Sequence, residues 1–402
     1  MVDARCETAS IVAGDKADEP PEAERIRRLV AIHGDPLLIL DCEAVRRQYR
    51  ALAAALPGVD LHYALKPLPH PAVVTTLMQE DAWFDLATSG EVDLVRDLGV
   101  ASQRCIHTHP IKRDRDIRDA LDFGVTTFVV DNPDELRKFE KYADQVELLL
   151  RVSFRSPAAK VDLSKKFGCT PDAARELLVM AHDLGIRIKG LSFHVGSQAA
   201  DPRKHVEAVN ACGAIIAWNK EAGLPPLSVL DIGGGFPVEY NEDVPPINEF
   251  CRPIREALAQ IPADVRLIAE PGRFISAPAI TAVSSVMGKA LRDGRWWYYL
   301  DDGVYGSYSG QMFDHAKYPV DCLEWHGERF PSVLAGPTCD SIDVIDEDIM
   351  LPELHEGDLV VGRMMGAYTW ASATEFNFFR KAQIIVVNEY VGEACEVVHL
   401  VG

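Results

Sequence analysis

Short apolar runs alternate with amphipathic helical patterns from about residue 43 to about residue 275. Eight runs have the length and composition of strands: Leu61–Leu65, Trp83–Leu86, Arg104–His107, Thr126–Val130, Glu147–Val152, Gly190–His194, Ser228–Ile232 and Arg266–Ala269. Helical spacing marks six stretches between them: Pro71–Gln79, Ser89–Leu98, Lys112–Phe123, Pro133–Tyr142, Pro171–Leu184 and Lys204–Glu221. Eight strand-then-helix units predict a (β/α)₈ barrel. The competing fold is a doubly wound open sheet, which typically has five or six strands and often an early Gly-x-Gly-x-x-Gly that this chain lacks.

The pattern changes after about residue 280, where helical periodicity becomes scarce. Short β-rich runs broken by Gly and Pro follow, and they predict a separate β domain, a sandwich or small barrel: Trp296–Leu300, Ser332–Ala335, Leu359–Val361 and Gln383–Val387. The strand-like run Pro36–Leu40 precedes the barrel, so we expect it to pair with this C-terminal sheet. The predicted organisation is a disordered tail at 1–22, an N-terminal segment at 23–42, a barrel at 43–278 and the β domain at 279–402.

Composition fits an ordinary globular protein of two domains, with 402 residues, 48% of them hydrophobic and 25% charged. A net charge of −20 disfavours nucleic acid and anionic membrane surfaces as partners. The chain has no apolar stretch long enough to span a membrane, and its polar N-terminus lacks the apolar segment of a signal peptide. The nine cysteines form no CxxC pair, which fits neither a disulfide framework nor a zinc site. We therefore expect a cytoplasmic protein that binds no metal.

Chemically useful residues gather at the carboxyl ends of the predicted strands, where barrel enzymes place their active sites. These residues are Lys66, Asp85, His107, Arg151, His194, Gly233–Gly235 and Glu270. Random sampling would rarely put so many functional side chains at one end of the strands. Their concentration there indicates an active site.

Lys66 carries the most information, because it ends an apolar run and precedes Pro67 and Pro69, which prevent a helix from starting at once. A lysine ammonium is costly to desolvate at a buried strand end. An imine with an aldehyde cofactor removes that charge, which is how enzymes hold pyridoxal phosphate (PLP). The alternative is a surface lysine that extends its ammonium into water.

Three further segments supply groups suited to a flat, phosphorylated cofactor. Phe193–Ser197 offers His194 to stack on a ring and a hydroxyl for phosphate, although a structural histidine is the alternative. The triple glycine Gly233–Gly235 allows backbone N–H groups to approach a phosphate, although a tight turn explains it as well. Ala269–Arg273 places a carboxylate suited to a protonated pyridine nitrogen near a guanidinium suited to phosphate.

The predicted β domain contributes two segments of its own. Gly336–Ser341 offers the Cys339 thiol beside the Asp340 carboxylate in a turn, and Gly366-Ala367-Tyr368 offers a phenol after small residues. A buried, inert cysteine is the ordinary alternative for the first of them.

In their order along the chain, these segments resemble the fold type III PLP decarboxylases, the family of the ornithine and diaminopimelate decarboxylases. The matching motifs are YALK, FDLATSGE, FHVGS, DIGGGFP, AEPGR and GPTCDS, followed by GAY. The resemblance runs from about residue 36 to about residue 392. It implies an alanine racemase-like barrel followed by a β domain.

The resemblance also implies a role for each matching residue. Lys66 would form the imine with PLP, and Asp85 and Glu91 would support its orientation. Arg151 and His194 would flank the cofactor, with His194 stacked on the ring. Glu270 would pair with the pyridine nitrogen. The phosphate would be held by Ser197, Gly233, Gly234, Gly235, Gly272, Arg273 and Tyr368.

Cys339 would return a proton to the substrate carbon after carbon dioxide leaves, according to the same resemblance. In the family, the residues at Cys339 and Asp340 reach the pocket of the neighbouring subunit. A head-to-tail homodimer with two shared active sites is therefore implied, with a small basic amino acid as its other partner.

The turn that carries the thiol separates branches of the family. Diaminopimelate decarboxylases resemble Cys-Glu-Ser there, whereas this chain has Cys339-Asp340-Ser341. The segments Gly303–Ser307 and Met312–His315 are similar to the ornithine decarboxylase branch, in which two aspartates clamp a distal ammonium. The substrate-binding residues would be Asp314, Asp340, Phe313 and Tyr305. Two departures from the family are Pro67-Leu68 after the lysine and Phe313 in place of a tyrosine.

The activity implied is decarboxylation of L-ornithine to putrescine, with L-lysine to cadaverine as a second reaction. Another amino-acid decarboxylase of this fold, acting on diaminopimelate, arginine or carboxynorspermidine, is the closest alternative. A racemase and a non-catalytic regulatory relative, like the antizyme inhibitors, are further alternatives. The presence of Lys66, Cys339 and the glycines argues against the regulatory one.

Overall fold

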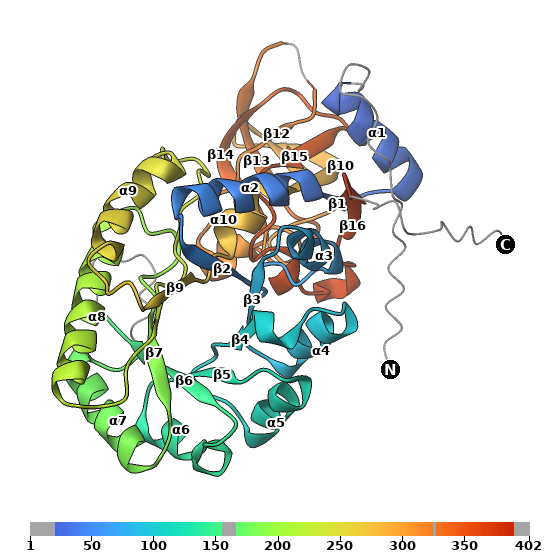
Figure 1. Cartoon of the computed structure of the whole chain (residues 1–402). Helices are drawn as coiled ribbons and strands as arrows, with labels where there is room; N and C mark the ends of the chain where they lie inside the picture. The colour runs from blue at the N-terminus through green and yellow to red at the C-terminus, as the bar shows by residue number, and fades with distance from the viewer. Residues whose placement is uncertain (1–20, 155–165, 325–326, 390–402) are drawn as a thin grey trace. The chain divides into compact units, whose positions relative to one another are not determined.

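The computed structural model describes residues 21–154, 166–324 and 327–389. They form two compact units (Figure 1). One unit is Arg47–Ser276, and the other combines the described residues up to Arg46 with those from Ala277 onward. The predicted tail at 1–22 lies outside the described residues except for Pro21 and Glu22.

Eight parallel strands close into a barrel within Arg47–Ser276, which confirms the predicted (β/α)₈ fold. In barrel order they are β2 (Val59–Ala64), β3 (Trp83–Leu86), β4 (Cys105–His107), β5 (Thr127–Val130), β6 (Glu147–Val152), β7 (Ile188–Phe193), β8 (Val229–Asp231) and β9 (Arg266–Ala269). The barrel closes where β2 pairs with β9, with Leu61 opposite Ala269. Its interior holds a cluster of branched apolar side chains: Ile106, Val129, Leu149, Val229 and Ile268.

The helices of this unit are α2 (Cys42–Ala55), in which the chain passes from one unit to the other, α3 (Pro71–Gln79), α4 (Ser89–Asp97), α5 (Asp114–Phe123), α6 (Pro133–Arg137), α7 (Pro171–Asp183), α8 (Arg203–Glu221), α9 (Ile247–Leu258) and α10 (Arg273–Ser276). Local sequence sets several of their starts. Helices α3, α6 and α7 each begin with a proline after a residue whose side chain caps the first turn. Helix α5 starts at Asp114 rather than at Lys112, because Asp116 accepts the Arg113 N–H at 3.0 Å and closes the first turn there.

The other unit is mostly β-sheet, as predicted. Its strands are β1 (Leu37–Asp41), β10 (Ile280–Arg292), β11 (Arg295–Leu300), β12 (Val320–Cys322), β13 (Phe330–Ala335), β14 (Val344–Leu351), β15 (Leu359–Gly362) and β16 (Gln383–Val387). Six of them pair in the order β12-β15-β10-β11-β13-β14. Strand β1 pairs antiparallel with β10 and parallel with β16, so the N-terminal segment is part of this sheet.

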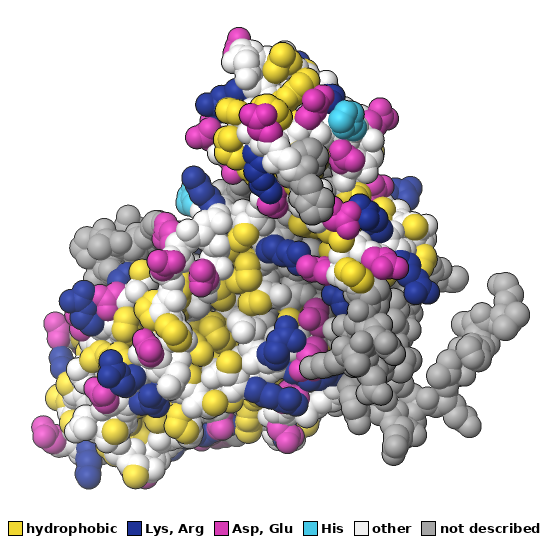
Figure 2. Space-filling model, turned by 90° about the horizontal axis from the view of Figure 1, so that it is seen from above, with side chains coloured by type: hydrophobic (Ala, Val, Ile, Leu, Met, Phe, Trp, Pro, Cys, Tyr) yellow, Lys and Arg dark blue, Asp and Glu magenta, His cyan; other side chains and the backbone are white. Residues whose placement is uncertain are grey.

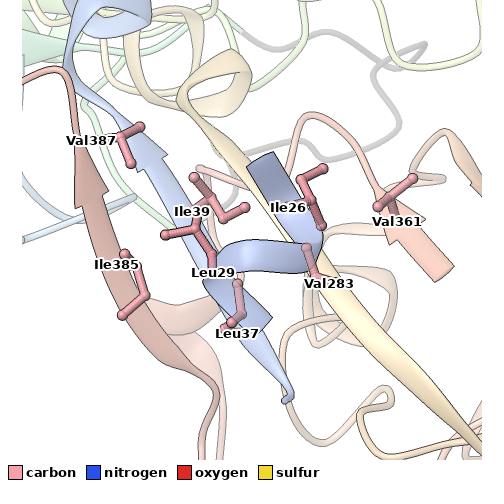
Figure 3. Close-up of a cluster of buried hydrophobic side chains, with 8 residues drawn as sticks. All are labelled: Ile26, Leu29, Leu37, Ile39, Val283, Val361, Ile385 and Val387. Carbon is pink, nitrogen blue, oxygen red and sulfur yellow. The ribbon is translucent and has the colours of Figure 1, made fainter. Parts of the chain in front are cut away.

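Helix α1 (Glu22–His33) also belongs to this unit, and the sequence pattern did not single it out. Its apolar stripe is narrow, with Ile26 and Leu29 buried. Both side chains join an apolar cluster from four strands (Figure 3), made of Ile26, Leu29, Leu37, Ile39, Val283, Val361, Ile385 and Val387. Burial against the sheet stabilises a helix whose own sequence is mostly polar.

Charged side chains of both signs are interspersed on the face of the molecule shown in Figure 2. Among the described helices, none combines the length and the apolar character needed to cross a membrane.

Candidate active site

The carboxyl ends of neighbouring barrel strands are tied together around Lys66. This residue lies in a turn after β2, where the Leu65 N–H donates to the Asp85 carbonyl at 3.2 Å. The Ala64 N–H donates to the Pro271 carbonyl at 3.1 Å, which links the same strand to the segment after β9. The Lys66 side chain is exposed, so the expectation of a buried ammonium is wrong. The buried end of the apolar run is Leu65, and the turn directs the next side chain out of the core.

Three acidic side chains are close enough to Lys66 for its charge to affect them. Asp85 is 3% exposed and accepts a hydrogen bond from the Thr108 hydroxyl at 2.5 Å. Burial raises the pKa of Asp85, Glu270 raises it further, and the Lys66 cation offsets part of this. Burial also raises the pKa of Glu91, which accepts the Ala87 N–H at 2.5 Å. The pKa of Glu270 is raised well above its usual range by burial and then by the neighbouring Asp231.

His194 follows β7 and has a defined tautomer. Its Nδ1 accepts the Gly196 N–H at 3.0 Å, so a neutral ring carries its proton on Nε2. Burial, then the Lys66 and Arg151 cations, lower the pKa of His194 well below its usual value. Arg151 lies in β6 with its guanidinium carbon 5.6 Å from the centre of the Phe167 ring. A neutral imidazole held in this way can stack on a flat ring.

The triple glycine after β8 forms a tight loop in which side chains have no room. A Cβ atom on Gly233 would lie 2.2 Å from the Phe193 carbonyl oxygen, and one on Gly235 would lie 2.5 Å from that of Gly196. Both residues also have left-handed backbone angles, with φ of +65° and +98°. The loop therefore packs directly on the segment that carries His194 and leaves its backbone bare.

A buried cation lies beside the Ser197 hydroxyl. Arg273 is 5% exposed, and its Nε donates to the Ser197 Oγ at 3.1 Å. Its NH1 donates to the Tyr240 hydroxyl at 2.7 Å. Sequence reasoning missed Tyr240, because a phenol in an irregular loop has no neighbouring pattern that marks it. Gly272 allows close packing here, since a Cβ would lie 2.6 Å from Pro67 Cγ.

These groups fit pyridoxal phosphate. Bare glycine N–H groups, a hydroxyl and a buried guanidinium suit a phosphate. A neutral imidazole suits the face of a pyridine ring, a carboxylate suits its nitrogen, and the Lys66 amine suits an aldehyde. Pro67-Leu68, the departure from the family pattern, leaves this arrangement intact: the Leu68 carbonyl accepts the Tyr63 hydroxyl at 3.1 Å.

His107, which the sequence placed with the strand-end residues, is not part of the cluster. Its neighbour in β4, Ile106, belongs to the barrel interior, so the His107 side chain points to the opposite face of the strand. There it is fully buried, with its ring centre 5.7 Å from that of Phe128.

In the β unit, the structure joins Tyr305 to Asp340. The Tyr305 hydroxyl donates to Asp340 Oδ2 at 2.6 Å, and this bond lowers the pKa of Asp340. Cys339, the residue before it, is exposed and is a free thiol. The turn is fixed by Asp343, a buried residue that sequence reasoning missed: it accepts the Thr338 N–H and the Val304 N–H, each at 2.9 Å.

The remaining predicted residues also lie in the β unit. Phe313 and Asp314 end the short helix α11 (Gly310–Asp314), with Phe313 68% exposed and Asp314 half-buried. Tyr368 has a left-handed backbone, with φ of +56°, and is half-buried. The structure describes these residues within their own unit, separately from the barrel cluster.

Comparison with known protein families decides the identity of the barrel. The family described as pyridoxal-dependent decarboxylase, pyridoxal binding domain, matches residues 42–277, more than half of the chain. The chain belongs to this family. It is therefore a PLP-dependent decarboxylase. Its closed barrel and its β-sheet unit match the fold of its solved relatives.

Relatives and solved structures place the chain within the family. A lysine/ornithine decarboxylase from Selenomonas ruminantium is 36% identical over 88% of this chain and 90% of its own. The crystal structure of a lysine/ornithine decarboxylase from Vibrio vulnificus, complexed with putrescine, is 59% identical with a TM-score of 0.88. The cadaverine complex of the Vibrio vulnificus enzyme is 60% identical with a TM-score of 0.89. Each covers 92% of this chain and 99% of the solved chain.

Proposed function

We propose that this enzyme decarboxylates L-ornithine to putrescine and, with the same residues, L-lysine to cadaverine. The observation that carries the proposal is the Asp340 carboxylate, held charged by the Tyr305 hydroxyl in the turn that also bears the Cys339 thiol. A charged carboxylate beside a proton donor suits a substrate with a distal ammonium. Solved relatives about 60% identical bind putrescine and cadaverine, the products of these two reactions.

The barrel residues would bind and orient the cofactor. PLP, when bound, supplies an electron sink for the electron pair left by carbon dioxide. Lys66 would bind its aldehyde carbon, and Glu270 would accept a hydrogen bond at its pyridine nitrogen. His194, with Arg151 nearby, would cover one face of the ring. Its phosphate would be held by Ser197, Gly233, Gly234, Gly235, Gly272, Arg273 and Tyr368.

Asp85 and Glu91 would support the orientation of Lys66, since Lys66 interacts electrostatically with both. Cys339 would hold the proton that replaces carbon dioxide on the substrate carbon. The exposure of its thiol supports contact with a substrate or a second chain.

Asp340 and Asp314 would bind the distal ammonium of the substrate, with Phe313 and Tyr305 shaping the pocket. Two carboxylates on one cation discriminate strongly against a substrate with a distal carboxylate, such as diaminopimelate. A single methylene separates ornithine from lysine and is worth only about 1–3 kcal/mol. We therefore propose that both substrates are accepted.

We further propose that the enzyme is a homodimer in which Cys339 and Asp340 serve the barrel of the partner copy. An apolar surface beside Asp340 supports this. Phe376 stacks on Tyr305 with ring centres 4.3 Å apart, and Phe378 is 97% exposed. Phe379 lies near them on the same surface, around a small cavity that Tyr305 and Phe376 also line. Exposed aromatic groups of this kind mark protein interfaces.

A reducing compartment suits the chain, and we propose the cytoplasm. The described part of the chain contains seven cysteines. Six of them are buried, and the one exposed thiol is Cys339. An exposed thiol with a proposed catalytic role needs a reducing environment to stay reduced.

Product analysis tests the substrate assignment. The PLP-loaded protein would be given L-ornithine, L-lysine, L-arginine and meso-diaminopimelate separately, and the amine products would be identified by chromatography. We expect putrescine and cadaverine from the first two. Lysine formed from diaminopimelate, without putrescine or cadaverine from the others, would show that the assignment of Asp314 and Asp340 is wrong.

A further inference from the structure

Asp231 is a buried acid to which the proposed function gives no role. It ends β8, directly opposite Ile268 of β9. Val229 and Ile268 point into the barrel. Asp231 lies two residues beyond Val229 in β8, and Glu270 lies two residues beyond Ile268, directly after β9. Because side chains alternate along a strand, Asp231 and Glu270 point to the same interior side.

Backbone hydrogen bonds fix the two strand ends beside each other. The Ile232 N–H donates to the Ile268 carbonyl at 2.9 Å, and the Glu270 N–H donates to the Gly233 carbonyl at 2.8 Å. The backbone positions from which the two carboxyl groups extend are therefore held beside each other. Both are buried, with Asp231 0% and Glu270 8% exposed.

The hydrogen bonds of Asp231 leave one oxygen to be satisfied. Its Oδ1 accepts the Gly233 N–H at 2.8 Å. Its Oδ2 is buried and has no N–H or O–H donor among the described residues. The Glu270 carboxyl is the acidic side chain close enough to Asp231 for each to shift the pKa of the other. Two ionised carboxylates have only acceptors, so a hydrogen bond between them requires a proton.

We propose that Asp231 is a positioning residue that shares one proton with Glu270, so that the pair carries one negative charge and presents the free Glu270 oxygen to the pyridine nitrogen. The inference rests on the proposed role of Glu270. Asp231 acts through Glu270: it fixes the orientation of that carboxyl and limits the charge buried at the barrel mouth.

The charged groups around Asp231 and Glu270 support the retention of one proton by the pair. Lys66 after β2 and Arg151 in β6 are the cations, and Asp85 in β3 is a further acid. Burial raises the pKa of Asp231 to about 6, and the hydrogen bond from Glu270 and the Gly233 N–H oppose that shift. Burial and Asp231 raise the pKa of Glu270 further. The pair therefore keeps one proton to a higher pH than an ordinary carboxyl group does.

Substitution by asparagine separates this role from simple packing. Asp231→Asn keeps an oxygen for the Gly233 N–H and supplies its own N–H to Glu270, so it imitates the protonated acid. Asp231→Ala removes both bonds. Asp343→Asn is the matched control, because Asp343 is also buried and accepts two backbone N–H groups, from Val304 and Thr338.

Infrared difference spectroscopy of the full chain without cofactor reads the proton directly. At neutral pH we expect Asp231→Asn and Glu270→Gln each to lack the absorption of one protonated carboxyl group that the wild type shows. We expect Asp343→Asn to keep that absorption. An unchanged band in Asp231→Asn would overturn the proposal.

PLP affinity, measured from fluorescence across the neutral pH range, is the second readout. The wild type is expected to bind more weakly as pH rises, Asp231→Asn to lose this pH dependence, and Asp231→Ala to bind about tenfold more weakly throughout. Equal pH profiles for the wild type and Asp231→Asn would also overturn the proposal. Carbon dioxide release by the wild type, measured separately, reports on the proposed function, so the two failures are distinguishable.

Discussion

The Tyr305 hydroxyl donates a hydrogen bond of 2.6 Å to Asp340 Oδ2 and holds that carboxylate in its charged form. The same ring stacks on Phe376, and the Thr374 N–H donates to the Tyr305 carbonyl at 2.8 Å. Tyr305 is therefore fixed on both sides, and Asp340 takes its orientation from it. Substrate recognition in this account depends on that relationship.

Removal of the Tyr305 hydroxyl should weaken binding of the distal ammonium. Tyr305→Phe keeps the ring on Phe376 and deletes the hydrogen bond to Asp340. We expect KM for L-ornithine to rise about tenfold, the scale of one hydrogen bond to a charged group, with a smaller change in kcat. Steady-state kinetics with ornithine and lysine measure this. A fall in kcat at constant KM would instead assign Tyr305 to the chemical step.

A side chain added within the glycine loop should weaken cofactor binding. In Gly235→Ala the new methyl would meet the Gly196 carbonyl oxygen at 2.5 Å, so the loop must move away from its phosphate-binding position. Gly223→Ala is the matched control, because Gly223 also has a left-handed backbone but its Cβ would meet nothing within 4 Å. We expect PLP affinity to fall at least about tenfold in the first variant only. Similar losses in both would mean that backbone strain, rather than space for phosphate, limits these positions.

Buried histidine should make the barrel sensitive to acid. His107 is fully buried, and burial lowers its pKa to about 3, whereas the unfolded chain has the ordinary value of 6.5. The unfolded state therefore binds more protons below pH 6.5, so stability falls as pH decreases from there toward 3. The slope from one such group approaches about 1.4 kcal/mol per pH unit.

His107→Leu should flatten this slope, because leucine cannot take up a proton. Neither ring nitrogen of His107 has a hydrogen-bond partner among the described residues, so the substitution removes no such bond there. Urea unfolding between about pH 5 and pH 7 measures the effect, with exposed His182→Gln as the control. An unchanged slope in His107→Leu would mean that other groups set the acid sensitivity.

Shared active sites predict complementation between inactive chains. Lys66→Ala and Cys339→Ala would each be inactive alone, and a mixed dimer would contain one site with both intact residues. We expect purified mixed dimers to recover up to about half of the activity of the wild type. Complete absence of activity in verified mixed dimers would contradict the shared-site arrangement.

The sequence predicted the barrel because its strands are buried on both faces and read as apolar runs, as in Leu148–Leu150. It missed α1 because only a narrow stripe of that helix is apolar, and its stability comes from contacts with a distant sheet. Lys66, His194 and Glu270 could be predicted because each follows a strand within a recognisable motif. Asp343 and Tyr240 could not, because their importance lies in hydrogen bonds to residues remote in sequence, Val304 and Arg273.

The central claim is that Lys66 and PLP together decarboxylate a basic amino acid, and carbon dioxide release from L-ornithine tests it most directly. The PLP-loaded wild type and Lys66→Ala would be assayed side by side. We predict release by the wild type and a loss of at least about a thousandfold in the variant, because the only proposed attachment for the cofactor aldehyde is removed. Equal release by both chains, or none by a wild type that has bound PLP, would contradict the account.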